Sequence, residues 1–154
     1  MRCSAGWTNT CSRKTDPNVT VPSPETAPGP EIGGSLVGRV IAMPADTNPE
    51  GDIFGGWLLA QMDLAGSTPA FDIAQGRCAT VAVDAMVFHQ PVSVGDEVSL
   101  YATVLKTGRT SIRVRVEAWK RPRSTHEISR VTEGVFTYVA IDEDRKPRPL
   151  PGQV

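Results

Sequence analysis

The spacing of apolar residues changes once along this chain, and that change limits the folds open to it. From about residue 56 to residue 75, apolar side chains recur with the period of an α-helix. After that they follow the two-residue period of β-strands in four segments, which cover residues 79–88, 98–107, 112–119 and 129–141. A shorter apolar segment, residues 36–43, precedes the helix and ends at Pro44. This order predicts an α+β protein in which an antiparallel sheet of about five strands packs against one long helix.

One helix cannot cover both faces of a sheet built from strands of this length. Both faces of the segment 129–141 are largely apolar, which is typical of a central strand. Because exposed apolar surface of this extent favours association, the pattern predicts a homo-oligomer.

The chain divides into a tail and one domain. Residues 1–35 are rich in Pro, Gly, Ser and Thr and poor in large apolar residues, so they predict a disordered tail. The tail lacks the apolar stretch of a secretory signal. The remainder, residues 36–151, is long enough for a single domain with its own core.

Charge and cysteine content exclude several classes of protein. The net charge of −1 gives no reason to expect nucleic-acid binding. The chain contains no run of 18 apolar residues, so no membrane-spanning helix is expected. The chain has three cysteines, none in a CxxC spacing, and an odd number does not form a disulfide framework. This favours a reducing, cytoplasmic environment. Cys78 fits a packing residue better than a nucleophile.

The most informative stretch is residues 48–66, where a loop of turn formers leads into the helix. Gly55 and Gly56 stand at the helix start, where free backbone N–H groups stabilise negative charge. Asp63 lies about two turns further on, roughly 20° from Gly56 around the helix axis, so the amides and the carboxylate face one direction. This arrangement suits the addition of water to a carbonyl group. The competing interpretation is a buried aspartate satisfied by backbone donors.

Two other residues near this helix have two interpretations each. Asp52, in the loop before the helix, is either a second active-site carboxylate or a turn or N-cap residue. Pro69 falls inside the helical pattern, where proline removes one backbone donor, so the sequence predicts a kink or a break there. Gly76 is a candidate C-terminal cap.

Outside the helix, one turn has the composition of a phosphate-binding site. Gly108, Arg109, Thr110 and Ser111 combine a cation, two hydroxyls and a glycine, although an ordinary hairpin turn has the same composition. No nucleotide-binding loop and no Gly-x-Ser-x-Gly motif occurs. His89 and His126 lie far apart without Cys or His neighbours, so no metal site is expected.

Four blocks of the sequence resemble a known family. The blocks MPADTNPEGDIFGGWLLAQMD, TVAVDAMVFHQPVSVGDEV, KTGRTSI and FTYVAIDEDRKPRPLP occur in this order, and together they resemble the hotdog-fold acyl-CoA thioesterases of the YciA-like bacterial group. The resemblance extends from about residue 36 to residue 151 and leaves out the tail.

The resemblance implies a fold, an assembly and a reaction. The fold is a long helix wrapped by a curved antiparallel sheet, and the assembly is a dimer, usually organised further into a hexamer as a trimer of dimers. The reaction is the hydrolysis of acyl-CoA to free acid and CoA, with no metal and no organic cofactor.

The resemblance also implies roles for individual residues. Asp63 matches the family's catalytic carboxylate, and Asp52 matches its second active-site position, contributed by the other subunit of the dimer. The amides of Gly55 and Gly56 match the oxyanion donors, and the turn 108–111 matches the segment that holds CoA. Pro69 departs from the expected pattern and affects the helix or the acyl tunnel more than the chemistry.

Two further functions remain open from the sequence. A hotdog hydratase or dehydratase needs a second acid–base group near the carboxylate, such as a histidine, and the helix contains none. A non-catalytic module that binds acyl-CoA is the alternative outside enzymes. A thiol-release assay separates both from a thioesterase.

Overall fold

The computed structural model describes residues 32–125 and 127–152. The predicted tail therefore lies outside the described residues as far as residue 31, as does His126. In chain order the elements are strand β1 (Ser35–Ile41), the short 3₁₀ helix η1 (Pro44–Asp46), helix α1 (Gly55–Ala74) and strands β2 (Cys78–Phe88), β3 (Glu97–Thr107), β4 (Ser111–Arg121) and β5 (Ser129–Ala140). The first strand begins at the last residue of the predicted tail.

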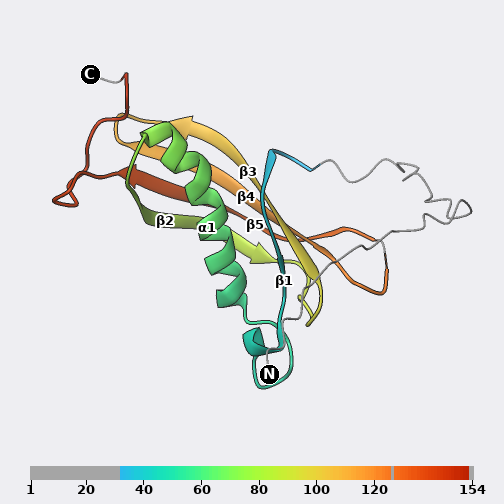
Figure 1. The fold of residues 1–154 in the computed structure, drawn as a ribbon. Coiled ribbons are helices and arrows are strands. Elements are labelled where there is room, and N and C mark those ends of the chain that lie inside the picture. Colours follow the sequence, from blue (N-terminus) through green and yellow to red (C-terminus); the bar gives the residue numbers. More distant parts are fainter. Residues whose placement is uncertain (1–31, 126, 153–154) are drawn as a thin grey trace, which may run out of the picture.

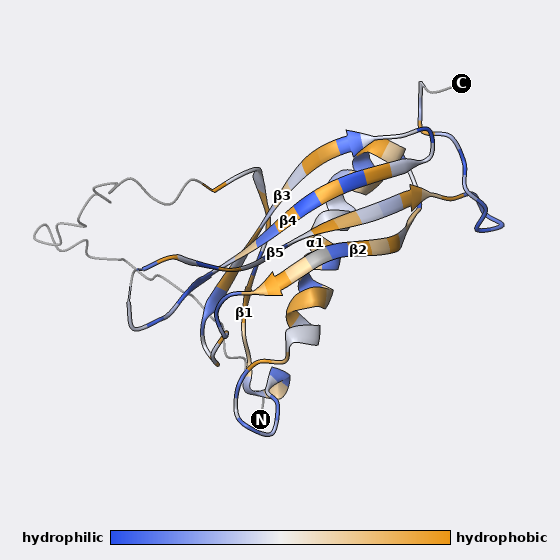
Figure 2. Ribbon diagram, turned by 180° about the vertical axis from the view of Figure 1, so that it is seen from behind, coloured by the Kyte–Doolittle hydropathy of each residue, from blue (hydrophilic) through white to orange (hydrophobic). Residues whose placement is uncertain are grey.

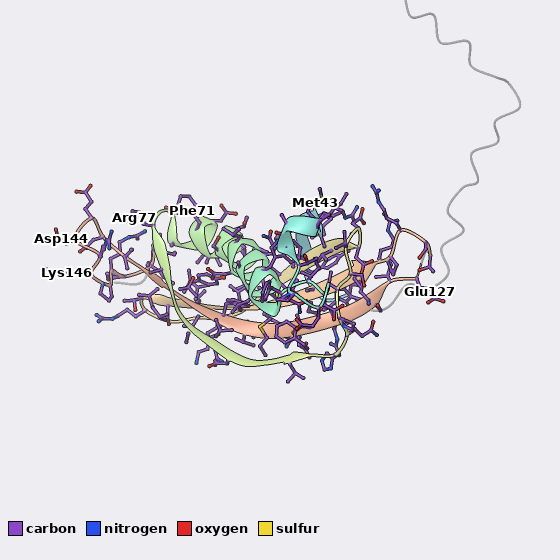
Figure 3. All side chains as sticks on the ribbon, turned by 90° about the horizontal axis from the view of Figure 1, so that it is seen from below. Met43, Phe71, Arg77, Glu127, Asp144 and Lys146 are labelled. Atoms are coloured by element: carbon purple, nitrogen blue, oxygen red, sulfur yellow. The ribbon has the colours of Figure 1, made fainter. Side chains whose placement is uncertain are left out.

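The five strands form one antiparallel sheet in the order β1-β3-β4-β5-β2. The sheet curves around α1, which lies along its concave face (Figures 1 and 3). The predicted architecture, one long helix against a curved antiparallel sheet of about five strands, is confirmed.

The core lies between α1 and the middle strands. In β4, the side chains of Ile112, Val114 and Val116 are fully buried against the helix, while Arg113 and Arg115 between them are exposed. Figure 2 shows this alternation from the face of the sheet that α1 does not cover. Leu58 and Met62 supply the helix side of the core. The two-residue period of the sequence thus marks the buried face of the central strands.

The predicted break at Pro69 is wrong, because α1 continues through Pro69 to Ala74. A single proline removes one backbone bond, to the carbonyl of Ala65, and the packing of the buried face on both sides of it holds the helix together. Ala65, Gly66 and Ala70 around the proline are all buried.

The helix ends at Gln75, which adopts the left-handed conformation with φ 49°. The Gln75 and Gly76 amides donate to the carbonyls of Asp72 and Phe71, each at 3.4 Å, which is the pattern of a Schellman motif. Gly76 therefore takes part in the cap, as predicted, but the left-handed residue is its neighbour Gln75. Arg148 adds a further bond, from Nη2 to the carbonyl oxygen of Ala74 at 2.7 Å.

Strand β2 forms one edge of the sheet, and it does not follow the strict alternation that its sequence predicts. Thr80 pairs with Tyr138, but Ala82 pairs with Thr137, so one extra residue is inserted at Val81. A second irregularity lies between Asp84 and Val87. Bulges of this kind change which side chains face the helix and cannot be detected from alternation alone.

Within the described residues, no helix is both long enough and apolar enough to cross a membrane.

Candidate active site

Asp63 lies near the middle of α1, half-buried, on the side that faces the sheet. Its carboxylate oxygen Oδ1 accepts a hydrogen bond from Thr80 Oγ1 at 2.7 Å. The Tyr138 hydroxyl lies 3.3 Å from the same oxygen and 2.9 Å from the backbone carbonyl oxygen of Asp63. The described partners of this carboxylate are therefore side-chain hydroxyls from β2 and β5, not the backbone donors of the competing interpretation.

Tyr138 is almost completely buried, and its ring stacks on that of Phe136 with the centroids 6.3 Å apart. Burial raises the pKa of the Tyr138 hydroxyl well above its usual range, and the negative charge of Asp63 and the hydrogen bond to it raise it further. The hydroxyl consequently stays protonated and remains a hydrogen-bond donor at neutral pH.

Gly66 allows the helix to approach Tyr138 this closely. A Cβ atom at this position would lie 2.4 Å from the Tyr138 hydroxyl oxygen and 2.9 Å from Val116 Cγ2. Only glycine leaves room for both side chains at this contact.

The N-terminal end of α1 carries open backbone donors. Phe54 is the N-cap, and its carbonyl accepts from the amides of Trp57 and Leu58 at 3.0 and 3.3 Å. Among the described residues the amides of Gly55 and Gly56 have no backbone partner, and both glycines are exposed. Such amides, at the positive end of a helix dipole, stabilise an anion.

A mainly apolar cavity of about 310 Å³ opens beside these donors. Its walls come from the loop before α1, from the start of the helix, from the end of β2 and from β5, and include Ile53, Phe54, Gly55, Phe88 and Val131. His89 also lines it, exposed and directly after β2, in agreement with a strand-end histidine.

Asp52 lies exposed in the loop before the helix. Asn48 Oδ1 closes this loop by accepting from the backbone amides of Asp52 at 2.9 Å and Glu50 at 3.1 Å. Since Phe54 occupies the N-cap position, Asp52 is not the N-cap residue. Among the described residues, no donor forms a hydrogen bond to its carboxylate.

The turn 108–111 joins β3 to β4 and is held by three backbone bonds. The Gly108 amide donates to the Ser111 carbonyl at 2.7 Å, the Ala140 amide to Thr110 at 2.9 Å, and the Leu150 amide to Arg109 at 2.8 Å. The Arg109 side chain is exposed. This turn and the C-terminal end of α1 lie at the same end of the molecule, away from Gly55 (Figure 1).

The structure therefore does not gather the predicted site residues at one point of a single chain. Gly56 and Asp63 share a face of the helix, but at about 1.5 Å per residue they are separated by about 10 Å along its axis. A thioester in bonding contact with Asp63 is beyond the reach of the amides of the same chain. The turn 108–111 lies near the C-terminal end of α1, at the other end of the helix from the open amides (Figure 1).

The sequence analysis missed Thr80 and Tyr138. Thr80 escaped because the bulge at Val81 changes the face on which it lies. For Tyr138 a signal was present, because a tyrosine inside an apolar central strand needs a partner for its hydroxyl.

The other candidates are structural. Cys78 is half-buried, and burial raises the pKa of its thiol while nearby Arg148 opposes the shift. Its Sγ lies 3.6 Å from the Ala70 carbonyl oxygen, which fits a packing role. In the part of the chain that the structure describes, no group of three or more His, Cys, Asp or Glu side chains is placed to hold a metal ion.

Comparison with known proteins relates this geometry to a family. Residues 50–125 match the sequence pattern of the thioesterase superfamily. The acyl-CoA thioester hydrolase YciA of Salmonella typhimurium is 52% identical over 123 residues, which cover 78% of this chain and 92% of the relative.

Solved structures agree with the sequence comparison. The hexameric thioesterase of Yersinia pestis superposes with a TM-score of 0.75 at 54% identity, covering 79% of this chain and 98% of that one. A hexameric, broad-specificity acyl-coenzyme A thioesterase superposes with a TM-score of 0.76 at 47% identity, covering 80% and 85% of the two chains.

Proposed function

The chain belongs to the thioesterase superfamily, among the YciA-like acyl-CoA thioester hydrolases, and we propose that it hydrolyses acyl-CoA thioesters to a free carboxylic acid and CoA. The observation that carries the chemistry is the half-buried carboxylate of Asp63, whose Oδ1 is held by Thr80 while the amides at the start of α1 stay open.

Two routes fit this carboxylate. As a general base, Asp63 takes a proton from water, the water oxygen bonds to the thioester carbon, the C–S bond breaks and the CoA sulfur leaves as a thiolate that takes up the proton. As a nucleophile, the Asp63 oxygen itself displaces the CoA thiolate, and water then hydrolyses the resulting anhydride to the free acid. In both routes the thioester oxygen becomes negatively charged, and the Gly55 and Gly56 amides are the donors that stabilise it.

A complete site needs two subunits. Since Asp63 and the glycine amides of one chain are about 10 Å apart, we assign the oxyanion donors and Asp52 to one subunit and Asp63 to its partner. We place the dimer contact at β2, because β2 is an edge strand with exposed apolar side chains, among them Val81 and Val87. Leu64 and Phe71 add an exposed apolar surface on α1 (Figure 3 labels Phe71). The hexameric relatives favour a trimer of such dimers.

The turn 108–111 is our candidate for the CoA end of the substrate. Its backbone is fixed from both sides, and the exposed Arg109 guanidinium is free to pair with a phosphate of CoA, beside the hydroxyls of Thr110 and Ser111. We assign the reaction no metal and no organic cofactor, so a chelator in the assay should leave turnover unchanged. We also predict a cytoplasmic location, because an odd number of cysteines gives no disulfide framework.

The test is release of the CoA thiol from acyl-CoA substrates of increasing chain length. Asp63→Asn keeps the shape of the side chain but removes its basicity, and we expect turnover to fall by at least ~10²-fold. Asp72→Asn is the matched control, because Asp72 is an exposed carboxylate on the same helix. Turnover near the wild-type value in a folded Asp63→Asn protein would contradict the assignment of Asp63. Tight binding of acyl-CoA without thiol release from the wild type would identify a binding module instead.

A further inference from the structure

Two strands place hydroxyl groups around a single carboxylate oxygen. Oδ1 of Asp63 accepts from Thr80 on β2 at 2.7 Å and lies 3.3 Å from the hydroxyl of Tyr138 on β5. Among the described residues, Oδ2 accepts no hydrogen bond. The two oxygens of this carboxylate are therefore in different surroundings.

The tyrosine fixes the helix turn as well as the carboxylate. Its hydroxyl carries one proton, and the shorter contact, 2.9 Å, is with the backbone carbonyl oxygen of Asp63. Because Tyr138 is buried and stacked on Phe136, its bond to the Asp63 carbonyl holds this turn of α1 at a fixed distance from the sheet. Thr80 is then the principal donor to the carboxylate itself.

The position of Thr80 depends on the bulge in β2. Thr80 pairs with Tyr138 and Val83 with Phe136, so the extra residue Val81 puts Thr80 and Val83 on the same side of the strand, where strict alternation would put them on opposite sides. Bulges often re-aim a side chain beside an active site. Thr80 is exposed in the single chain, and the bond that its hydroxyl makes among the described residues is the one to Asp63.

From these contacts we propose that Thr80 and Tyr138 are positioning residues: Thr80 holds Oδ1 of Asp63, and Tyr138 holds the helix turn that carries it, so that Oδ2 is presented to the reacting water or thioester. The proposal rests on the thioesterase function and deepens it. It applies to both routes, since each uses one carboxylate oxygen that must point at the reaction centre. Without these donors the carboxylate rotates about its terminal torsion, and the fraction of time in the reactive orientation falls.

Such a role has a kinetic signature that a purely structural role lacks. Loss of orientation lowers kcat, while KM stays near its wild-type value because neither residue is assigned to substrate binding.

The experiment compares Thr80→Val, Thr80→Ser and Tyr138→Phe with the wild type in the thiol-release assay. We expect Thr80→Val and Tyr138→Phe each to lower kcat by about 10- to 100-fold and to leave KM near its wild-type value. Thr80→Ser, which keeps the hydroxyl, should restore most of the activity. Thr137→Val and Tyr101→Phe are the controls, because these residues lie in the same sheet and make no described bond to Asp63. Thermal unfolding of each variant reports whether it is folded.

The outcomes separate this proposal from the function on which it rests. An active wild type with Thr80→Val and Tyr138→Phe at the wild-type kcat overturns the positioning role and leaves the thioesterase function intact. A Thr80→Ser protein as impaired as Thr80→Val also overturns it, because the hydroxyl is then not what matters. If Thr80→Val fails to fold, Tyr138→Phe and Thr80→Ser still decide the question. A wild type without thiol release overturns the proposed function itself.

Discussion

At the scale of single residues, the candidate site depends on a contact between a glycine and a tyrosine. Gly66 has no side chain, so α1 approaches β5 until the Tyr138 hydroxyl reaches the backbone and carboxylate of Asp63. Asp63 is the carboxylate that we assign to the chemistry, and its hydrogen-bond partners lie far from it in the sequence. A glycine inside a helix lowers helix stability by about 1 kcal/mol relative to alanine, and here the closer packing offsets that loss.

Substitution of this glycine tests the packing argument. In Gly66→Ala the new methyl group would lie 2.4 Å from the Tyr138 hydroxyl oxygen, which cannot retreat without losing its bonds to Asp63. We expect the free energy of unfolding to fall by about 1–2 kcal/mol despite the better helix propensity of alanine, and turnover to fall with it. Denaturant unfolding measures the first effect and thiol release the second.

The control is the same substitution in the same helix. At Gly56 an added Cβ meets no atom within 4 Å, so Gly56→Ala should leave the free energy of unfolding unchanged or raise it slightly. A Gly66→Ala protein as stable as Gly56→Ala would show that the helix is not packed against Tyr138 as closely as described.

At the scale of elements, α1 is continuous although it contains Pro69. The proline leaves the Ala65 carbonyl without its usual helical donor, so the tertiary packing of the buried face must compensate for the lost bond. The helix is then closed at its end by the Schellman bonds of Gln75 and Gly76 and by Arg148. Asp63 and the open amides at the start of the helix all precede Pro69, so the proline does not fall between them.

Replacing the proline should therefore stabilise the protein. Pro69→Ala restores the backbone donor in a helix that already has the right geometry, and we expect the free energy of unfolding to rise by about 1–3 kcal/mol. Thr68→Ala, at the exposed neighbouring position, should change it by less than about 0.5 kcal/mol. If thermal or denaturant unfolding shows that Pro69→Ala is no more stable than the wild type, the lost backbone bond is not a net cost to the folded protein.

At the scale of the whole molecule, the proposed site is distributed between chains. Within one chain the open amides, Asp63 and the turn 108–111 lie at the start, middle and far end of α1 (Figure 1). The edge strand β2 and the exposed side chains of α1 provide the surface through which a second copy can complete the site.

Mixing two inactive variants tests this division. In hetero-oligomers assembled from Asp63→Asn and Asp52→Ala subunits, some sites receive an intact Asp63 from one chain and an intact Asp52 from the other. Random assembly makes these sites on the order of a quarter of the total, so thiol release should recover to about that share of the wild-type value. A mixture no more active than either variant alone would place both carboxylates of a site in the same chain, or remove Asp52 from the reaction.

The sequence by itself determined the order of the elements, the buried face of Ile112, Val114 and Val116 in β4, and the location of Asp63 on a helix that begins with two glycines. These features follow from local periodicity and from turn chemistry, which act over a few neighbouring residues. The α+β architecture followed from the same periodicity, and four ordered sequence blocks pointed to the family.

Only the tertiary structure decided the surroundings of Asp63. The bulge at Val81 directs Thr80 at the carboxylate, Gly66 admits Tyr138, and packing carries α1 through Pro69. Each of these depends on contacts between segments that are distant in the sequence, so no local pattern records them. The separation of the open amides from Asp63 follows from the length of helix between them, and it supports our proposal of a site completed by a second subunit.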